Sequence, residues 1–254
     1  MRIISFSADG IINAAENGFY DWLTEQDADF VCVQDLRCSE YDLQDNKFFP
    51  QDYNAYFLDD IDGKANGVAV YCRKLPKAIM SGLGFADFDM EGRYIQADYE
   101  NLSVGCLLAP SAEPGNAEQL ARKMSFYEQL GGHLQKVRNK RREFIICGNW
   151  HIAHTAADVQ DTDRNSNAPG FLAEERQWMD ELLESGYVDA FREVNSDQDE
   201  FSWWPDGKRG ENGWRSDFHI VSKGLQYTVD YGAIYKNKEF STHAPIIMDY
   251  DIEL

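Results

Sequence analysis

The sequence lacks any apolar segment long enough to cross a membrane. A membrane-spanning helix needs about 20 consecutive apolar residues, and no stretch of this 254-residue chain comes near that length. The first ten residues, MRIISFSADG, also lack the cationic start, the long apolar run and the cleavage site of a signal peptide. We therefore expect a cytoplasmic protein.

Cysteine is scarce, and its spacing does not indicate a disulfide framework. The five cysteines are an odd number without C-x-x-C spacing, and four of them fall in apolar runs typical of strands. Buried reduced thiols explain this distribution better than disulfides or a metal site do. The five are Cys32, Cys38, Cys72, Cys106 and Cys147.

Positive charge is also in short supply. The chain has 24 Lys and Arg against 44 Asp and Glu, a formal net charge of −20. Repulsion of this size opposes autonomous binding to nucleic acids, whose affinity comes largely from neutralised phosphates. One stretch, which we call the basic strip, has the opposite sign and suggests local docking. Its cations are Lys136, Arg138, Lys140, Arg141 and Arg142.

The chain does have enough apolar material for a large core. Hydrophobic residues make up 43% of the sequence and aromatic residues 13%. Short apolar runs alternate with helical patterns, as in layered α/β folds, and no linker or repeat divides the chain, so we expect one domain over 1–254. The predicted strands cover 1–6, 30–34, 67–73, 92–99, 102–108, 143–147, 201–204, 218–222 and 246–252, and the predicted helices cover 11–26, 117–140 and 173–185.

Polar residues stand at the ends of several predicted strands, where α/β enzymes place their sites. Taken singly, each is more often an anchor for a loop than a catalyst. In this order they resemble the exonuclease III / abasic endonuclease family, part of the endonuclease–exonuclease–phosphatase superfamily. The resemblance rests on SFSADG, VQDLR, GVAVY, GRYIQAD, CGNWHIAH, FSWWPD, GWRSDFH and STHAP, and covers nearly the whole chain.

The resemblance implies a four-layer α/β sandwich, in which two packed mixed sheets are flanked by helices. It also implies a site that hydrolyses phosphodiesters with Mg²⁺. Such a site needs a carboxylate on the metal, an Asp that activates water, and a His that a second Asp orients. The family's active-site positions fall on Ser7, Asp35, Leu108, Asn149, His151, Asp217, Thr242 and His243.

Most of these positions carry a residue unsuited to that chemistry. Asn149 stands where the resemblance implies the water-activating Asp, and an amide cannot accept that proton near neutral pH. Leu108 replaces the Tyr, and Thr242 replaces the Asp that orients His243. We therefore predict that no catalytic site is intact and that no cofactor is needed, with Asp35 and Asp217 as weak candidates for a cation.

Within the family the sequence is most similar to the catabolite repression control (Crc) branch, which lacks nuclease function. The similarity rests on EYDLQD, LPKAIMSGLGF, LLAPS, NKRREFIICG and FSTHAPIIMDYD. It implies a translational repressor that acts with the RNA chaperone Hfq on A-rich mRNA, binding the Hfq–RNA complex but having little affinity for RNA alone. The basic strip is the candidate docking surface, although cations in the last turn of a helix also complement its dipole.

Other interpretations stay open. The chain could be a Mg²⁺-dependent exodeoxyribonuclease III or abasic-site endonuclease with a remodelled site that still uses Asp35, Asp217 and His243. It could also be a phosphatase or phosphodiesterase for another substrate. We favour packing over base stacking for the two tryptophans of FSWWPD, and we disfavour a zinc site at the two histidines that follow a strand. The residues concerned are Trp203, Trp204, His151 and His154, with Arg192, Lys208 and Arg209 as possible extensions of the docking surface.

Overall fold

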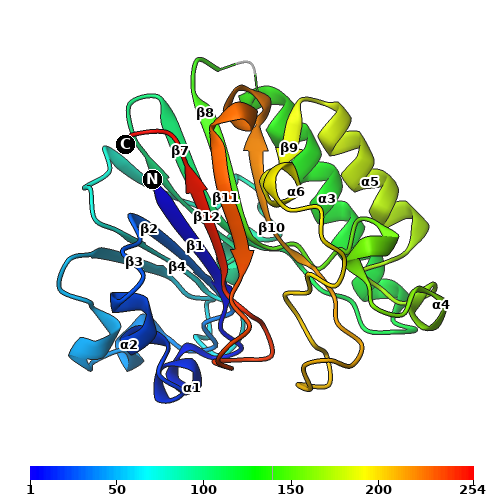
Figure 1. Ribbon diagram of the computed structural model, residues 1–254, viewed down its shortest axis with the longest axis horizontal. Helices are drawn as coiled ribbons and strands as arrows, with labels where there is room; N and C mark the ends of the chain where they lie inside the picture. The colour runs from blue at the N-terminus through cyan, green and yellow to red at the C-terminus, as the bar shows by residue number, and fades with distance from the viewer. Residues whose placement is uncertain (139) are drawn as a thin grey trace.

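A computed structural model describes residues 1–138 and 140–254. Its described residues form two six-stranded mixed sheets that stand face to face (Figure 1). The first sheet has the order β11-β12-β1-β2-β4-β3 and the second β5-β6-β7-β8-β10-β9. Each sheet contains one parallel pair, β1–β2 in the first and β7–β8 in the second, and its other pairs are antiparallel.

The strands of the first sheet are β1 (Arg2–Ser7), β2 (Phe30–Gln34), β3 (Asn54–Leu58), β4 (Val68–Cys72), β11 (Val229–Ile234) and β12 (Ile246–Tyr250). Those of the second are β5 (Ala78–Ser81), β6 (Tyr94–Asp98), β7 (Leu102–Leu108), β8 (Glu143–Asn149), β9 (Tyr187–Asp189) and β10 (Asp217–Ser222). The α-helices are α1 (Ile11–Glu16), α2 (Phe19–Thr24), α3 (Ala117–Val137), α4 (Thr162–Asn165), α5 (Ala173–Glu184) and α6 (Ala190–Val194). Short 3-10 helices cover Glu40–Asp42, Asn46–Phe48, Asp89–Glu91, Ala156–Asp158 and Lys223–Thr228.

The hydrophobic core is divided by the two sheets. One cluster lies between the sheets and is built from both, for example Val70 of β4 and Val104 of β7. A second cluster joins the first sheet to α1 and α2, and a third joins the second sheet to α3 and α5. Because β2 and β7 are covered on both faces, they read as continuous buried runs rather than alternating ones. The expected four-layer sandwich is confirmed.

The long helix α3 follows directly from its sequence. The Asn116 side chain accepts a hydrogen bond from the amide of Gln119 at 3.1 Å and so caps the first turn. Buried residues then recur at helical spacing, with Phe126, Leu130 and Leu134 facing the second sheet. The helix ends at Val137; the prediction extended it to 140 and included residue 139, which lies outside the described residues.

Two element predictions were wrong. The expected helix over 11–26 is two short helices, because Gly18 adopts the left-handed conformation (φ 84°) and breaks the hydrogen-bond ladder. The expected strand over 201–204 forms only isolated bridges, in which Trp203 pairs with Trp214 and His243. All five cysteines are buried and free, as expected. No helix among the described residues is long and apolar enough to span a bilayer.

Candidate active-site cleft

The ends of the two parallel strand pairs meet at one edge of the sandwich. Ser7 closes β1 and Asn149 closes β8, and the Asn149 Nδ2 donates to the Ser7 Oγ at 3.3 Å across the two sheets. Leu108, the last residue of β7, lies beside Asn149 in the parallel register, and Asp217, the first residue of β10, lies opposite it. The structure therefore brings these family positions together.

Asn149 is held on both sides of its amide. Its Oδ1 accepts the backbone N–H of His151 at 3.0 Å, while its Nδ2 points to Ser7. The side chain is buried, at 1% exposure. An amide in this setting positions its neighbours but has no basic atom with which to take a proton from water.

Asp217 and His243 form a buried pair. The His243 Nδ1 lies 2.8 Å from Asp217 Oδ2, and the Ser202 hydroxyl donates to the same oxygen at 2.6 Å. Burial lowers the pKa of His243, but Asp217 and the nearby carboxylates outweigh burial and raise it above the usual value, which favours the imidazolium. The indole of Trp203 stacks on the imidazole, with 5.7 Å between the ring centres. Among the described residues, Asp217 Oδ1 is buried without a hydrogen-bond partner.

A guanidinium joins the two remaining carboxylates of the cleft. Arg37 donates to both oxygens of Asp35, at 3.0 and 2.6 Å, and to Asp9 Oδ1 at 3.0 Å. Asp9 Oδ2 accepts the hydroxyl of Thr242, so Thr242 binds Asp9 and not His243. The expectation that His243 lacks an orienting aspartate was wrong, because Asp217 holds its Nδ1. Burial raises the pKa of Asp9, but His243, Thr242 and Arg37 outweigh it and lower the pKa below its usual value. For Asp35 burial dominates over Arg37, and the pKa is raised.

The backbone around this edge is strained. Asp9, Asp35, Arg37 and His151 all have positive φ values between 48 and 60°. Such conformations cost of order 1 kcal/mol or more for residues other than glycine, and they persist where the surrounding structure fixes them. The fold therefore holds a specific loop arrangement at the cleft.

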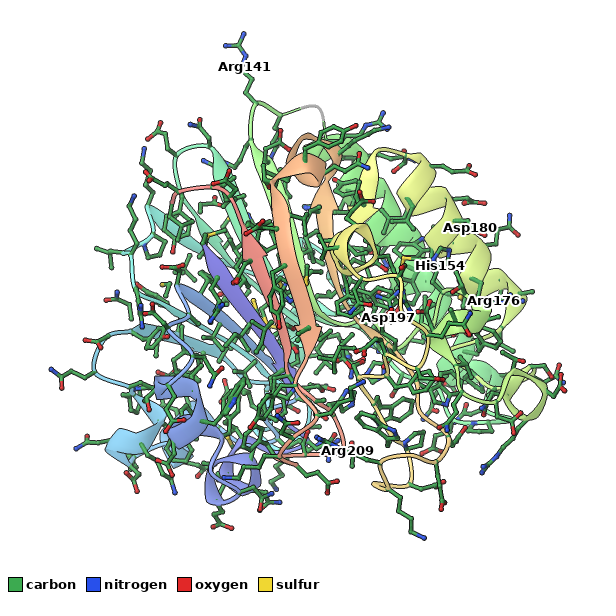
Figure 2. All side chains as sticks on the ribbon, in the orientation of Figure 1. Arg141, His154, Arg176, Asp180, Asp197 and Arg209 are labelled. Carbon is green, nitrogen blue, oxygen red and sulfur yellow. The ribbon has the colours of Figure 1, made fainter. Side chains whose placement is uncertain are left out.

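The two histidines after β8 do not form a zinc site. His154 Nε2 pairs with Asp180 of α5 at 2.7 Å, on the outer side of the molecule (Figure 2). His151 instead lies near His243: burial, followed by the charges of Lys123 and His243, lowers the pKa of His151 well below the usual value. Within residues 1–138 and 140–254, no group of three or more His, Cys, Asp or Glu could hold a metal ion.

Comparison with known proteins agrees with the fold. Residues 7–233 match the endonuclease/exonuclease/phosphatase family. The chain is 30% identical to an exodeoxyribonuclease of Bacillus subtilis over 97% of this chain and 98% of that protein. It is 28% identical to a DNA-(apurinic or apyrimidinic site) endonuclease of Dictyostelium discoideum, over 99% of this chain and 71% of that protein.

This chain belongs to the endonuclease/exonuclease/phosphatase family. Among solved structures, an AP endonuclease from Archaeoglobus fulgidus superposes with a TM-score of 0.90 at 23% identity, covering 99% of this chain and all of that one. A 3′-5′ exonuclease from Neisseria meningitidis gives 0.87 at 20% identity, with 99% and 100% covered. These similarities confirm the exonuclease III-like fold.

The Mg²⁺ that the family implies does not fit the described side chains of this cleft. The resemblance to the family implies a metal-binding role for Asp35, yet both of its oxygens accept N–H groups of Arg37. Asp217 offers one free oxygen, and its other oxygen is shared by Ser202 and His243. A hard dication requires several oxygen ligands around one point. One free oxygen does not meet that requirement.

The sequence comparison with the family missed three members of this cleft. Arg37 and Asp9 form the ion-pair bridge, and Ser202 supports Asp217. Arg37 follows Asp35 by two residues after a buried strand, and that charge pattern could have indicated a local pair. The contact between Arg37 and Asp9 spans 28 residues and has no local signal.

The basic strip lies at the other end of β8, and the structure divides it into two groups. Arg142 pairs with Asp98 at 2.8 Å, and Arg138 donates to the backbone oxygen of Ser185. Lys136, Lys140 and Arg141 are exposed, and Arg141 projects from the end of the molecule (Figure 2). The strip therefore contributes to the fold through two cations and presents the other three to solvent.

The remaining predicted surface residues serve mainly the fold. Arg192 binds Asp158 at 2.8 Å. Arg209 lies over the ring of Trp204, which is itself 3% exposed. Lys208 is exposed. Trp204 is packed, as expected, whereas Trp203 lines the cleft against His243.

Proposed function

We propose that this protein is a non-catalytic post-transcriptional regulator of carbon catabolite repression, which docks on Hfq-bound, A-rich mRNA. The proposal that the protein does not catalyse hydrolysis rests mainly on Arg37. Its guanidinium forms ion pairs with Asp9 and Asp35, where the resemblance to the family would place a metal. A positive charge from the chain itself partly neutralises these two carboxylates and so lowers their affinity for an external cation.

The chemistry of the cleft supports the same proposal. Hydrolysis needs a group that takes a proton from water, and general-base catalysis contributes typically about 10²–10⁴ in rate. Asn149 cannot act in this way, and the Nδ1 of His243 is already engaged by Asp217 at 2.8 Å. Leu108 offers no hydroxyl toward a phosphate. Because these groups would act together, their losses act on the same step and do not simply multiply.

The charge distribution supports docking to an assembly rather than to free RNA. The net charge of −20 opposes general phosphate binding. Three exposed cations at one end, Lys136, Lys140 and Arg141, can still meet phosphates locally while a preassembled complex supplies the other contacts. The identity of that complex, Hfq with RNA, rests on the resemblance to the Crc branch.

A nuclease assay tests the catalytic part. Purified protein is incubated with an abasic-site duplex and with a recessed 3′ end, in Mg²⁺ and then in Mn²⁺, beside an active family member. We expect no cleavage. Cleavage that disappears in the Asp217→Ala variant would refute the proposal and identify a working site.

A gel-shift assay tests the docking part. The double variant Lys136→Glu/Arg141→Glu should abolish assembly on Hfq–RNA while keeping the melting temperature. Arg142 is left intact because a glutamate there would face Asp98 and destabilise the fold. The charge-matched control is Lys47→Glu/Lys238→Glu, which reverses two exposed lysines on the first-sheet side. If the test variant assembled on Hfq–RNA as well as the unaltered protein does, the basic strip would not be part of the interface.

The second candidate function is that of a nuclease: a Mg²⁺-dependent exodeoxyribonuclease III or abasic-site endonuclease acting in DNA repair. It is favoured by the names of the relatives, since both the Bacillus protein and the Dictyostelium protein are nucleases. The Asp217–His243 pair and the free Asp217 Oδ1 are the features of this cleft that such an enzyme could use. The cleavage assay separates the two candidates directly.

A further inference from the structure

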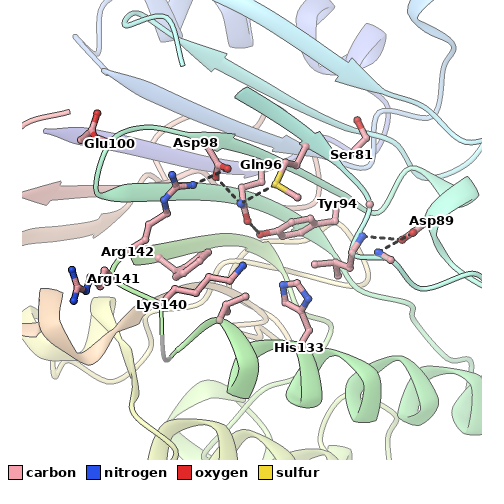
Figure 3. Close-up of a pocket in the computed structure, with 16 residues that line it drawn as sticks. Ser81, Asp89, Tyr94, Gln96, Asp98, Glu100, His133, Lys140, Arg141 and Arg142 are labelled. Atoms are coloured by element: carbon pink, nitrogen blue, oxygen red, sulfur yellow. Dashed lines mark hydrogen bonds and ion pairs between the residues drawn. The ribbon is translucent and has the colours of Figure 1, made fainter. Parts of the chain in front are cut away.

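A second cavity lies at the end of the molecule opposite the cleft. It measures about 730 Å³ and opens between the β5–β6 edge of the second sheet and the last turns of α3 (Figure 3). Phe144, near the start of β8, lines it, whereas Asn149 at the other end of that strand belongs to the cleft. Six residue steps along β8 separate Glu143 from Asn149 by about 20 Å, so the two sites are distinct.

The floor of this cavity is a connected set of polar side chains on a sheet face that is otherwise apolar. The Tyr94 hydroxyl donates to Gln96 Oε1 at 2.5 Å, and Gln96 Nε2 donates to Asp98 at 2.8 Å. Arg142 pairs with the other oxygen of Asp98 at 2.8 Å (Figure 3). Tyr94, Gln96 and Asp98 are all 9% exposed or less, so their orientation is fixed by the fold.

One donor of this floor has a poor partner. Apart from Asp98, the acceptor near Gln96 Nε2 is the thioether sulfur of Met80, at 3.8 Å. A thioether is a weak acceptor. A ligand that presented a carbonyl oxygen or a ring nitrogen here would give this amide N–H a better partner.

The walls are apolar, and the rim carries the cations Lys140 and Arg141 together with the carboxylates Asp89 and Glu100. Met80 and Leu83 form one wall, and Val137 and Phe144 form part of the other. Lys140 extends over the opening toward His133, while Arg141 points away from it (Figure 3). Burial, followed by Lys140 and Lys136, lowers the pKa of His133, so the imidazole is neutral and its ring adds to the wall.

We propose that this cavity binds one nucleotide, with the base between the apolar walls above Gln96 and the phosphate at Lys140. The volume lies within the range of about 300–1,000 Å³ found for small-molecule sites. The apolar walls do not suit a sugar phosphate, and the polar floor does not suit an acyl chain. A nucleotide combines a planar apolar face, a hydrogen-bonding edge and a phosphate in one ligand.

The nucleotide has two possible sources, a free mononucleotide or one unit of a single strand. Neither requires Hfq, so this inference does not rest on the proposed function. If the strip failed to mediate assembly, the cavity could still bind a nucleotide, and the two results are measured separately.

Titration calorimetry of the full-length protein tests the proposal. The probes are the four ribonucleoside 5′-monophosphates, the corresponding nucleosides, inorganic phosphate, and the matching homopolymer hexaribonucleotides. We expect saturable binding of at least one monophosphate or hexamer, with weaker binding of its nucleoside and of phosphate. Binding of the hexamer without its monophosphate would identify the strand as the source.

Two variants locate the binding site. Lys140→Glu should weaken nucleotide binding about tenfold or more, because it removes a charge-assisted contact and adds a repulsive one. Its matched control is Lys238→Glu, an exposed lysine beside Gly18 at the start of α2, which should leave affinity within about twofold. Met80→Glu, at an edge-strand position that is 51% exposed, should also weaken binding without lowering the melting temperature.

Three results would overturn the proposal. One is the absence of saturable binding for every nucleotide probe at millimolar concentration. Another is equal binding of inorganic phosphate and monophosphate, which would leave only an anion site. The third is nucleotide binding that neither Lys140→Glu nor Met80→Glu weakens, since the nucleotide would then bind elsewhere.

Discussion

Replacing Arg37 by alanine is the most direct test of the ion-pair bridge. The substitution leaves Asp9 and Asp35, whose side chains are 21% and 15% exposed, as neighbouring carboxylates without their shared cation. Removing one partner from a fully buried pair costs about 3–5 kcal/mol, and from a surface pair about 1 kcal/mol or less. The Arg37 side chain is 49% exposed, and solvent screens it. We therefore expect a loss of about 2 kcal/mol.

That loss corresponds to a melting temperature lower by about 4–8 °C for a chain of this size. The bridge also predicts how Mg²⁺ acts. In the Arg37→Ala variant the two carboxylates are free to attract a cation, and a cation at ten times its dissociation constant stabilises by about 1.4 kcal/mol. Millimolar Mg²⁺ should therefore raise the melting temperature of the variant and leave that of the unaltered protein nearly unchanged.

Calorimetric melting with and without Mg²⁺ measures both effects. Lys47→Ala is the control, since the exposed Lys47 makes a long pair of 4.0 Å with the exposed Asp45 and lies 5.1 Å from the centre of the Phe48 ring, contacts that are weak at the surface, so it should shift neither value appreciably. An equal Mg²⁺ response in the unaltered protein and the variant would show that Arg37 does not occupy the cation position. A variant as stable as the unaltered protein would show that the bridge contributes little.

Three further predictions concern the cleft and the core. Because the pKa of His243 is raised on folding, its pair with Asp217 stabilises the fold fully below the unfolded-state pKa of about 6.5. That stabilisation is lost as the pH rises through the pKa of His243 in the folded state. Denaturant unfolding from pH 6 to 9 should show this decline in the free energy of unfolding, and His243→Asn should flatten it. Asn149→Asp should not by itself produce cleavage of an abasic duplex, and the new carboxylate opposite Asp217 should cost about 0.5–1 kcal/mol in the same unfolding assay. Arg215→Met should cost about 3–5 kcal/mol in urea unfolding, since it leaves the buried Asp189 without its ion pair at 2.6 Å and leaves Asp158 with Arg192 as its remaining ion pair, whereas the exposed Arg164→Met should cost less than about 0.5 kcal/mol.

The sequence predicted best those elements whose burial is uniform. The strands over 30–34 and 102–108 were placed with their observed bounds, because every residue in them is covered by the sheets and their helices. β5 was missed because its edge position leaves Ala78, Met80 and Ser81 exposed, and no apolar pattern marks it. Helical spacing continued across Gly18 because α1 and α2 pack on the same face of the first sheet, so periodicity alone could not locate the break.

Prediction of the site was limited by contacts between distant segments. The family positions could be found from motifs, and the structure places Ser7, Leu108, Asn149 and Asp217 together at one edge. The partners of those side chains could not be found in the same way. Ser202 reaches Asp217 from a loop whose pattern suggested a strand, and the role of Arg142 in the cavity floor was hidden because Asp98 lies on another strand.

Asn149 shows why family membership and catalysis are separate questions here. Its Oδ1 accepts the His151 N–H at 3.0 Å, as an aspartate oxygen in the same place could, and its Nδ2 adds a bond to Ser7. An amide side chain at position 149 is therefore compatible with the fold, which superposes on that of an AP endonuclease with a TM-score of 0.90. Under the proposed function the chemical consequence is much larger, because an NH₂ group in place of a carboxylate oxygen cannot accept a proton from water. Overall similarity depends on the many residues of the three cores, whereas the reaction depends on a few side-chain atoms.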